Sequence, residues 1–308
     1  MKMVIANHDF VHMSNDLRFI HRLYRAYLRG PSHPGKLRIL RWMERRLFPD
    51  RGLPFDVDGG IRQYINPDNE FEYLLLKGGQ YQVSLNQFMR QNLNQGNSVG
   101  IAGISFGQQV IFASQAVGPS GCVVAIDPSP SALLRTWNNL TLNDLSNNVR
   151  LVCAGLGEHS ATLAIGGPNV RNVNSGSFIK PADGPPIYAL VETLPEMLQR
   201  LQIACLDMFL LDVIGFELPV LRGMRAPFFP SFMTVAIHSW ALQKTKTSLA
   251  DYTDTLNRLG YSCWTLEGMP PVSIETLRGC QLVAVRNGAA MPRWLNKESS
   301  MPPGVWNS

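Results

Sequence analysis

From residue 97 onward, short apolar runs alternate with segments of helical periodicity, and this alternation most constrains the fold. The expected strands are 99–104, 122–126, 149–153, 206–213, 232–237, 261–266 and 281–285. The expected helices are 107–117, 130–143, 191–202, 216–223 and 248–259. Continuously apolar strands separated by helices predict a parallel sheet covered on both faces. The connection 267–280 is too short for a parallel crossover, so the seventh and last strand should be antiparallel.

The N-terminal part has a different character. Apolar positions at helical spacing within 15–48 predict two short helices. Ten basic and two acidic residues lie between Arg18 and Arg51. We interpret them as a solvated face on helices packed against the main body; weak contact of residues 18–51 with an anionic surface is the alternative. These helices could also mediate a homodimer.

Three domains follow from these patterns. We expect a basic helical appendage and linker at 1–66, the α/β domain at 67–290 and a tail at 291–308. The residues before the main alternation predict a strand at 70–76 and a helix at 84–93. The Gly/Pro/Asn-rich stretch 166–186 is predicted to be a long loop, and loops of that length are often functional.

Charge and cysteine usage bear on partners and location. A net charge of +5 is only mildly basic, so no nucleic acid is expected. No secretory signal is recognised at the start, and the apolar stretches are shorter than a membrane span needs. The five cysteines lie in or beside apolar runs and are predicted to be reduced, buried thiols. A cytoplasmic protein is therefore expected.

A glycine-bounded turn and a carboxylate mark the first candidate site. Gly103, Ser105 and Gly107 lie between the first expected strand and its helix, where backbone N–H groups can approach a ligand. The second strand ends in Asp127-Pro128, a position where an acid accepts hydrogen bonds from ribose hydroxyls.

The third strand and the helix before it extend this site. The third strand ends in Ala154-Gly155-Leu156-Gly157, and its small residues would leave space for an adenine ring. Asn139 and Asn143, one helical turn apart, could orient the adjoining loop or simply cap and pack.

Polar side chains also follow the fourth and fifth strands. Asp212 and His238 should reach the same edge of the sheet, with Glu217 soon after Asp212. Histidine is the usual general base near neutral pH, and a neighbouring carboxylate orients its ring. We predict that these three residues bind or deprotonate a substrate. A divalent metal at Asp212 and Glu217 is a weaker alternative, and no metal is predicted.

From about Lys77 to Arg286 the chain resembles the FkbM-type methyltransferases. The resemblance rests on VGIAGISFGQQVIFASQAVGPSGCVVAIDPSP, on NNLTLNDLSNNVRLVCAGLG and on VETLPEMLQRLQIACLDMFLLDVIGFELPVLRGM. It implies a Rossmann-like fold, S-adenosyl-L-methionine (SAM) as cofactor and O-methylation of a hydroxyl on a sugar or natural-product-like small molecule. It also implies cofactor roles for part of the site. These residues are Gly103, Ser105, Gly107, Asp127, Asn139, Asn143 and Ala154.

Two other functions remain open at this point. Ile101, Ile214 and Ala236 stand where the family has acidic residues, so the chain could be a catalytically impaired, methyltransferase-like binding module. An NAD-dependent dehydrogenase would share the glycine turn and the strand-end acid. The turn lacks the G-x-G-x-x-G spacing of such enzymes, which disfavours this reading.

Overall fold

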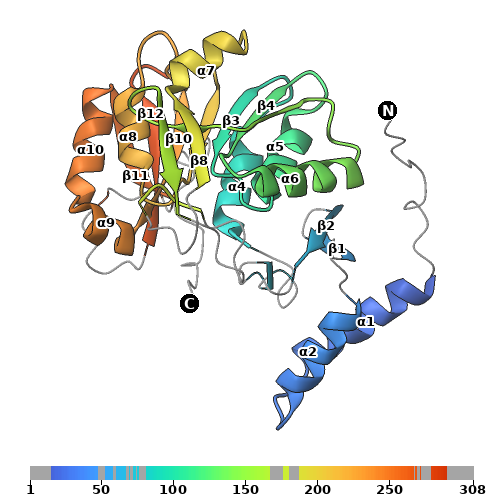
Figure 1. The fold of residues 1–308 in the computed structure, drawn as a ribbon. Coiled ribbons are helices and arrows are strands. Elements are labelled where there is room, and N and C mark those ends of the chain that lie inside the picture. The colour runs from blue at the N-terminus through green and yellow to red at the C-terminus, as the bar shows by residue number, and fades with distance from the viewer. Residues whose placement is uncertain are drawn as a thin grey trace, which may run out of the picture. The chain divides into compact units, whose positions relative to one another are not determined.

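The computed structural model describes residues 15–47, 53–57, 60–66, 81–166, 176–179, 187–266 and 279–289, and the single residues 69, 72, 73, 75, 268 and 271. The chain divides into two compact units, one before Gln82 and one from Gln82 onward (Figure 1). The domain boundary predicted at residue 66 stays a prediction. The tail predicted at 291–308 lies outside the described residues.

The first unit contains the two predicted helices and a hairpin. The helices are α1 (Asn15–Arg29) and α2 (Lys36–Leu47). Strands β1 (Leu53–Val57) and β2 (Ile61–Ile65) pair antiparallel where a linker was expected. Alternate residues of β2 are buried. Gln63 interrupts this alternation in the sequence, and Gly, Pro and Asp nearby suggested a loop.

The strand predicted at 70–76 is wrong. Its described residues Glu72, Tyr73 and Leu75 are helical. Asn69 explains the difference, because its side-chain Oδ1 accepts a hydrogen bond from the backbone N–H of Glu72 at 3.2 Å and its carbonyl accepts from the N–H of Tyr73 at 2.9 Å. A local cap therefore overrides the apolar run.

The second unit is built on the seven-stranded sheet that the sequence predicts. Its order is β11-β12-β10-β9-β3-β4-β5. Only β12 runs antiparallel to its neighbours, which confirms the predicted α/β, Rossmann-like fold class. The bounds are β3 Ser98–Ala102, β4 Cys122–Ile126, β5 Val149–Val152, β9 Met208–Leu211, β10 Phe232–His238, β11 Tyr261–Thr265 and β12 Gly279–Arg286.

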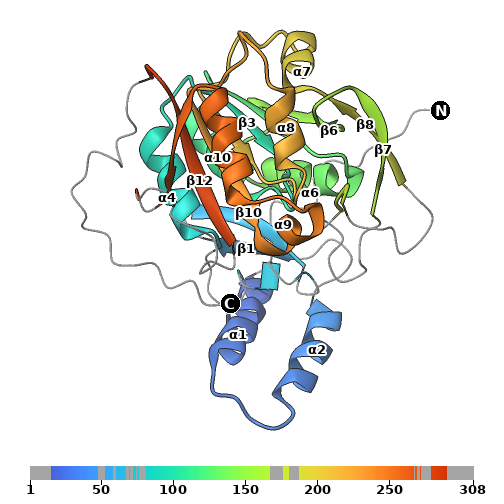
Figure 2. The ribbon, with the colours of Figure 1, turned by 90° about the vertical axis from the view of Figure 1, so that its left-hand side faces the viewer.

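Helices cover both faces of this sheet (Figure 1 and Figure 2). One layer consists of α4 (Val83–Asn92), α5 (Gln108–Val117) and α6 (Pro130–Leu142). The other contains α7 (Leu194–Arg200), α8 (Glu217–Gly223) and α10 (Leu249–Arg258). A further short helix, α9 (Ser239–Thr245), follows β10 directly and was not predicted. Because these strands are parallel, the turns that lead from their carboxyl ends into the helices all lie at one edge of the sheet.

A second, three-stranded sheet was also missed. It consists of β6 (Gly155–Leu156), β8 (Ile187–Glu192) and β7 (Ala161–Ile165), in that order. Of the loop predicted at 166–186, Gly166 and 176–179 are described, and Gly166 forms a bridge with Ser177.

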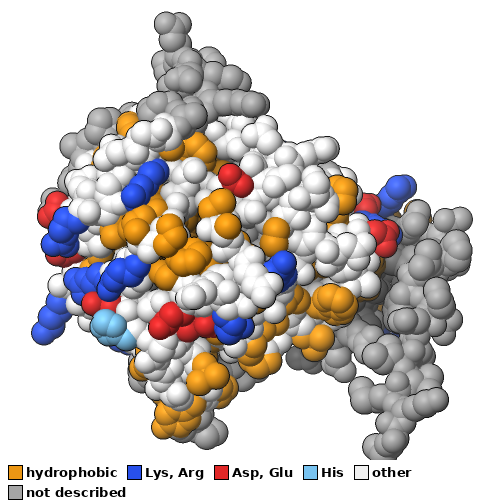
Figure 3. Space-filling model, turned by 90° about the horizontal axis from the view of Figure 1, so that it is seen from above, with side chains coloured by type: hydrophobic (Ala, Val, Ile, Leu, Met, Phe, Trp, Pro, Cys, Tyr) orange, Lys and Arg blue, Asp and Glu red, His pale blue; other side chains and the backbone are white. Residues whose placement is uncertain are grey.

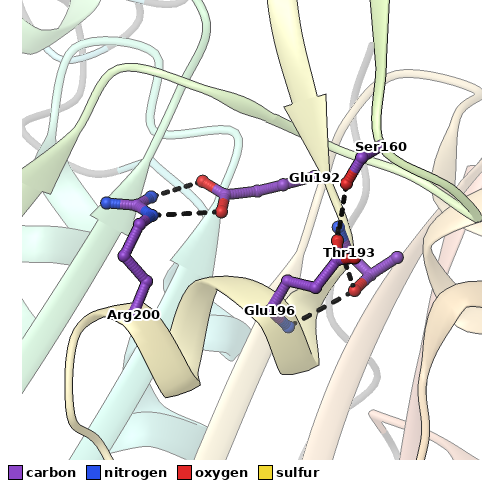
Figure 4. Close-up of polar contacts among 5 residues, drawn as sticks. All are labelled: Ser160, Glu192, Thr193, Glu196 and Arg200. Carbon is purple, nitrogen blue, oxygen red and sulfur yellow. Dashed lines mark hydrogen bonds and ion pairs between the residues drawn. The ribbon is translucent and has the colours of Figure 1, made fainter.

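Polar contacts join this small sheet to α7 (Figure 4). Thr193 and Glu196 form a reciprocal capping box at the start of α7. Ser160 donates a hydrogen bond to Glu196 Oε2 at 2.6 Å, and Arg200 pairs with Glu192 at the end of β8. The cap therefore fixes both the helix start and the strands beside it.

The structure bears on the predicted absence of a membrane span and on the predicted burial of the cysteines. No helix in the described part of the chain has the length and apolar character needed to cross a bilayer. The prediction of buried cysteines is wrong for Cys153 and Cys205, which are exposed. Both lie just outside their strands, where an apolar run no longer indicates burial.

Candidate active site

The glycine turn is closed by a hydrogen bond from Gly107 N–H to the carbonyl of Ile104, at 2.7 Å. Gly103, Ser105 and Gly107 all have positive φ, at 82°, 50° and 86°. A Cβ on Gly103 would lie 1.8 Å from the backbone oxygen of Asp212. Glycine is therefore required at 103 by close contact between the ends of β3 and β9.

Helix α6 holds the same turn from outside. A Cβ on Gly107 would lie 2.6 Å from Oγ1 of Thr136. Asn139 Nδ2 donates to the carbonyl of Phe106 at 3.0 Å, and Asn143 Nδ2 donates to the carbonyl of Asn139 at 2.6 Å. Asn139 thus holds the glycine turn and not the 154–157 loop that we expected it to orient, and Asn143 caps the end of α6, which was the alternative. Their cofactor role stays a prediction.

Asp127 faces this turn across the end of β4. Its Oδ2 accepts from Ile104 N–H at 3.0 Å, and its Oδ1 accepts from Ser129 N–H at 2.9 Å. Burial raises the pKa of Asp127 to about 6, although hydrogen bonds from the backbone N–H groups of Ser129, Ile104 and Ser105 oppose the rise. A carboxylate has about four lone-pair sites, so these three N–H donors leave room for a hydroxyl donor.

Gln108 adds a feature that the sequence did not mark. It directly follows the turn as the first residue of α5, and its side chain is fully buried. Neither its Nε2 nor its Oε1 has a hydrogen-bond partner among the described residues. Unpaired buried amide groups are costly and indicate a missing partner. Gln108 is therefore a second buried polar side chain beside the turn, and no partner for its amide is found among the described residues.

The residues predicted to line an adenine pocket are mostly packed by protein. Ala154 and Leu156 belong to the hydrophobic core, and Pro128 is half-buried. A Cβ on Gly155 would lie 2.7 Å from Phe178, and one on Gly157 would lie 2.8 Å from Val191. The glycines thus make room for side chains, which corrects the expectation that they leave open space. Cofactor contacts of Pro128, Ala154 and Leu156 stay predictions.

The predicted acid and histidine do meet. Asp212 follows β9, His238 ends β10, and Asp212 Oδ1 lies 2.9 Å from His238 Nε2. Each side chain is about one-third exposed, with values of 33% and 31%. The pair is therefore both hydrogen-bonded and accessible to a substrate. Because the Asp212 carbonyl touches Gly103, the pair shares an edge of the sheet with the glycine turn.

Glu217 lies beneath this pair and is fully buried at the start of α8. Its Oε1 accepts from the N–H groups of Val213 at 3.0 Å and Gly215 at 3.1 Å, and its Oε2 accepts from Gly215 at 2.9 Å. Burial and the charge of Asp212 raise the pKa of Glu217 to about 7, while His238 opposes the rise. Glu217 therefore shapes the 212–217 turn instead of facing solvent.

Two partners of this turn have no signal in the sequence. Burial and the Glu217 carboxyl, to which Tyr252 is hydrogen-bonded, raise the pKa of Tyr252. Ser177 Oγ donates to the carbonyl of Ile214 at 2.9 Å. Ile214 itself has φ of 50°, which is strained for a β-branched residue. Both partners come from distant parts of the chain, so no local motif could have identified them.

The two other replaced acidic positions are part of the core. Ile101 and Ala236 are 2% and 4% exposed, within β3 and β10. Neither position offers a polar group to a ligand. The ionisable side chains described at this edge are the Asp127 carboxylate on one side of Gly103 and the Asp212–His238 pair on the other.

The same three side chains meet the spacing of a metal site. One ligand atom from each of Asp212, Glu217 and His238 lies within 4.8 Å of the others. A divalent cation could be held by two carboxylates and an imidazole. However, both oxygens of Glu217 already accept backbone N–H groups, so ligation would compete with the 212–217 turn.

Comparison with known proteins agrees with the sequence resemblance. The family model of the methyltransferase FkbM domain matches residues 101–263, more than half of the chain. No curated protein matches the chain in sequence.

Several solved structures resemble the chain at low identity and low TM-score. A rRNA methylase from Streptococcus thermophilus is 12% identical with a TM-score of 0.40, over 67% of this chain and 97% of that chain. A SAM-dependent methyltransferase from Aquifex aeolicus is 14% identical with a TM-score of 0.39, over 66% and 87%. A SAM-dependent O-methyltransferase from Thermotoga maritima is 13% identical with a TM-score of 0.37, over 79% and 81%. Similarity at this level says nothing of what this chain binds or modifies.

Proposed function

Because the chain belongs to the methyltransferase FkbM domain family, we propose that it transfers a methyl group from SAM to a hydroxyl oxygen of a small molecule. Sugars and natural-product-like compounds are the proposed acceptors. The observation that carries the proposal is the 2.9 Å contact between Asp212 and His238, exposed at the edge that also holds the glycine turn.

Asp127 is the proposed anchor of the methyl donor. Its carboxylate would accept hydrogen bonds from the ribose hydroxyls, and the Gly103–Gly107 turn would lie along the same molecule. When bound, SAM supplies a methyl group attached to a positively charged sulfur. The sulfur keeps the electron pair of the S–C bond when the methyl group is transferred. The chain must therefore position an acceptor oxygen and remove its proton.

His238 is the proposed general base. Asp212 Oδ1 lies 2.9 Å from Nε2, and a carboxylate at this distance orients the imidazole ring and raises its basicity. His238 would take the hydroxyl proton as the new carbon–oxygen bond forms. The Asp212 carboxylate then stabilises the imidazolium, as a paired acid does for a catalytic histidine. A pure binding module would have no need of this pair, which favours the enzyme.

The test measures methyl transfer from labelled SAM to a panel of sugar and phenol hydroxyls. We expect His238→Ala and Asp212→Asn to lower kcat by about 10²- to 10⁴-fold, the usual contribution of general base catalysis. His159→Ala serves as the matched control, because that histidine is exposed on the surface. Wild-type turnover by His238→Ala, or no transfer by the wild type to any hydroxyl, would overturn the proposal.

A chelator distinguishes the base from the metal alternative. If His238 acts as a base, turnover in the same assay should survive EDTA, because no step of the proposed reaction uses a metal ion. Loss of turnover with EDTA, restored by Mg²⁺ or Mn²⁺, would instead assign Asp212, Glu217 and His238 to a metal site.

A further inference from the structure

Helix α1 exposes apolar side chains on the face opposite its buried one. Tyr24 and Leu28 are buried at 0% and 6% exposure. Phe19 and Leu23, one helical turn apart, are 61% and 51% exposed. Exposed Arg22 adjoins them along the same face. An aromatic and an aliphatic residue beside arginine, turned away from the core, form a surface that needs a partner.

Helix α2 repeats this arrangement. Leu40 is buried, whereas Ile39 and Trp42 are 44% and 62% exposed. Arg46 lies over the Trp42 ring at 5.7 Å, one turn further along. Arg38 is exposed one turn before Trp42. Each helix of the first unit therefore presents apolar side chains edged by arginine, and we call these two faces the basic aromatic surface.

Charge is what distinguishes this surface. Helices α1 and α2 together contain nine basic and two acidic residues. On the face of the molecule shown in Figure 3, by contrast, basic and acidic side chains are interspersed. Two of the basic side chains, Arg25 and Lys36, donate to backbone carbonyls, and two acidic residues cannot neutralise nine basic ones. A partner of this surface must therefore be anionic and must also accept apolar side chains.

We propose that the basic aromatic surface binds the headgroup region of an anionic phospholipid bilayer. Tryptophan and phenylalanine partition into the boundary between headgroups and acyl chains, while arginine pairs with the phosphates. A second copy of the chain fits less well, because it would bring one basic surface against another. A nucleic-acid duplex would satisfy the arginines and leave the apolar side chains in water, and the test below includes RNA because single-stranded bases can stack on aromatic rings. This inference is independent of the proposed methyl transfer.

The test is sedimentation of the full chain with vesicles of phosphatidylcholine, alone or mixed with phosphatidylglycerol. We expect binding to the mixed vesicles, weakened by added salt, and little binding to phosphatidylcholine alone. Arg38→Glu with Arg46→Glu should lower affinity at least tenfold, since each basic residue contributes about fivefold. Phe19→Ser with Trp42→Ser should lower it by about tenfold or more.

Leu134→Ser with Trp137→Ser is the matched control. These side chains are also exposed, on α6 of the other unit, and their loss should leave vesicle binding unchanged. The substituted positions are all exposed, and unchanged circular dichroism checks that each variant is folded. Three outcomes would overturn the proposal: equal binding to both vesicle types or none, a dimer abolished by Trp42→Ser, or tighter binding to RNA than to the mixed vesicles.

Discussion

Glu217 shows how one buried carboxyl can shape a site that it does not enter. Its two oxygens accept hydrogen bonds from the backbone N–H groups of Val213 and Gly215, and these bonds bend the chain just after Asp212. The strained backbone of Ile214 lies inside the same bend. Strain of this kind persists where surrounding contacts enforce it, and it is common at functional sites. The bend therefore helps to place Asp212 against His238.

This burial has a consequence for stability. The pKa of Glu217 is raised to about 7, so the folded chain holds this proton more tightly than the unfolded chain does. Stability should therefore fall as pH rises from the ordinary glutamate range to about 7, by up to about 3 kcal/mol for this group. Asp127, with a pKa raised to about 6, acts in the same direction.

Urea unfolding at about pH 5 and about pH 8 tests this prediction. Glu217→Gln keeps an oxygen acceptor for the backbone and does not titrate, so the difference between the two pH values should shrink. Part of the difference should remain, because Asp127 still titrates. The same difference in wild type and variant would contradict the assignment.

At the scale of elements, the junction of β3 with α5 is the most constrained part of the site. Gly103 packs closely against the end of β9, and Gly107 packs closely against α6. We predicted this turn from the sequence, but we explained its glycines by the close approach of a ligand to the backbone. The contacts that require them come from Asp212 and Thr136, which only the folded chain brings near.

Gly103→Ala and Gly288→Ala separate the cost of backbone strain at positive φ from the cost of a close contact with the new Cβ. Both glycines have positive φ, at 82° and 88°, but a Cβ on Gly288 meets nothing within 4 Å. Gly288→Ala should cost about 1–2 kcal/mol from backbone strain alone. Gly103→Ala should cost more by about 1–3 kcal/mol, because the Asp212 backbone must move. Equal losses in the free energy of unfolding would show that the close contact is absent.

For the whole molecule, the seven-stranded sheet was predictable because its central strands are buried on both faces and read as unbroken apolar runs. The β1–β2 hairpin and the β6–β8–β7 sheet were not, since their strands are short and partly exposed. The site divides in the same way. Strand-end residues such as Asp127 and His238 follow from topology, whereas Gln108 and Tyr252 acquire their roles through burial and long-range contacts.

Methyl transfer as proposed depends most on Asp127 as the anchor of the methyl donor, and calorimetry with SAM tests this anchor directly. We expect the wild type to bind SAM with micromolar affinity and to ignore NAD. Asp127→Asn, which keeps one of the two acceptor oxygens, should bind about ten- to a hundredfold more weakly, and Asp127→Ala should bind more weakly still. Wild-type affinity in Asp127→Ala, or no heat of binding from the wild type, would contradict a SAM site at this edge of the sheet.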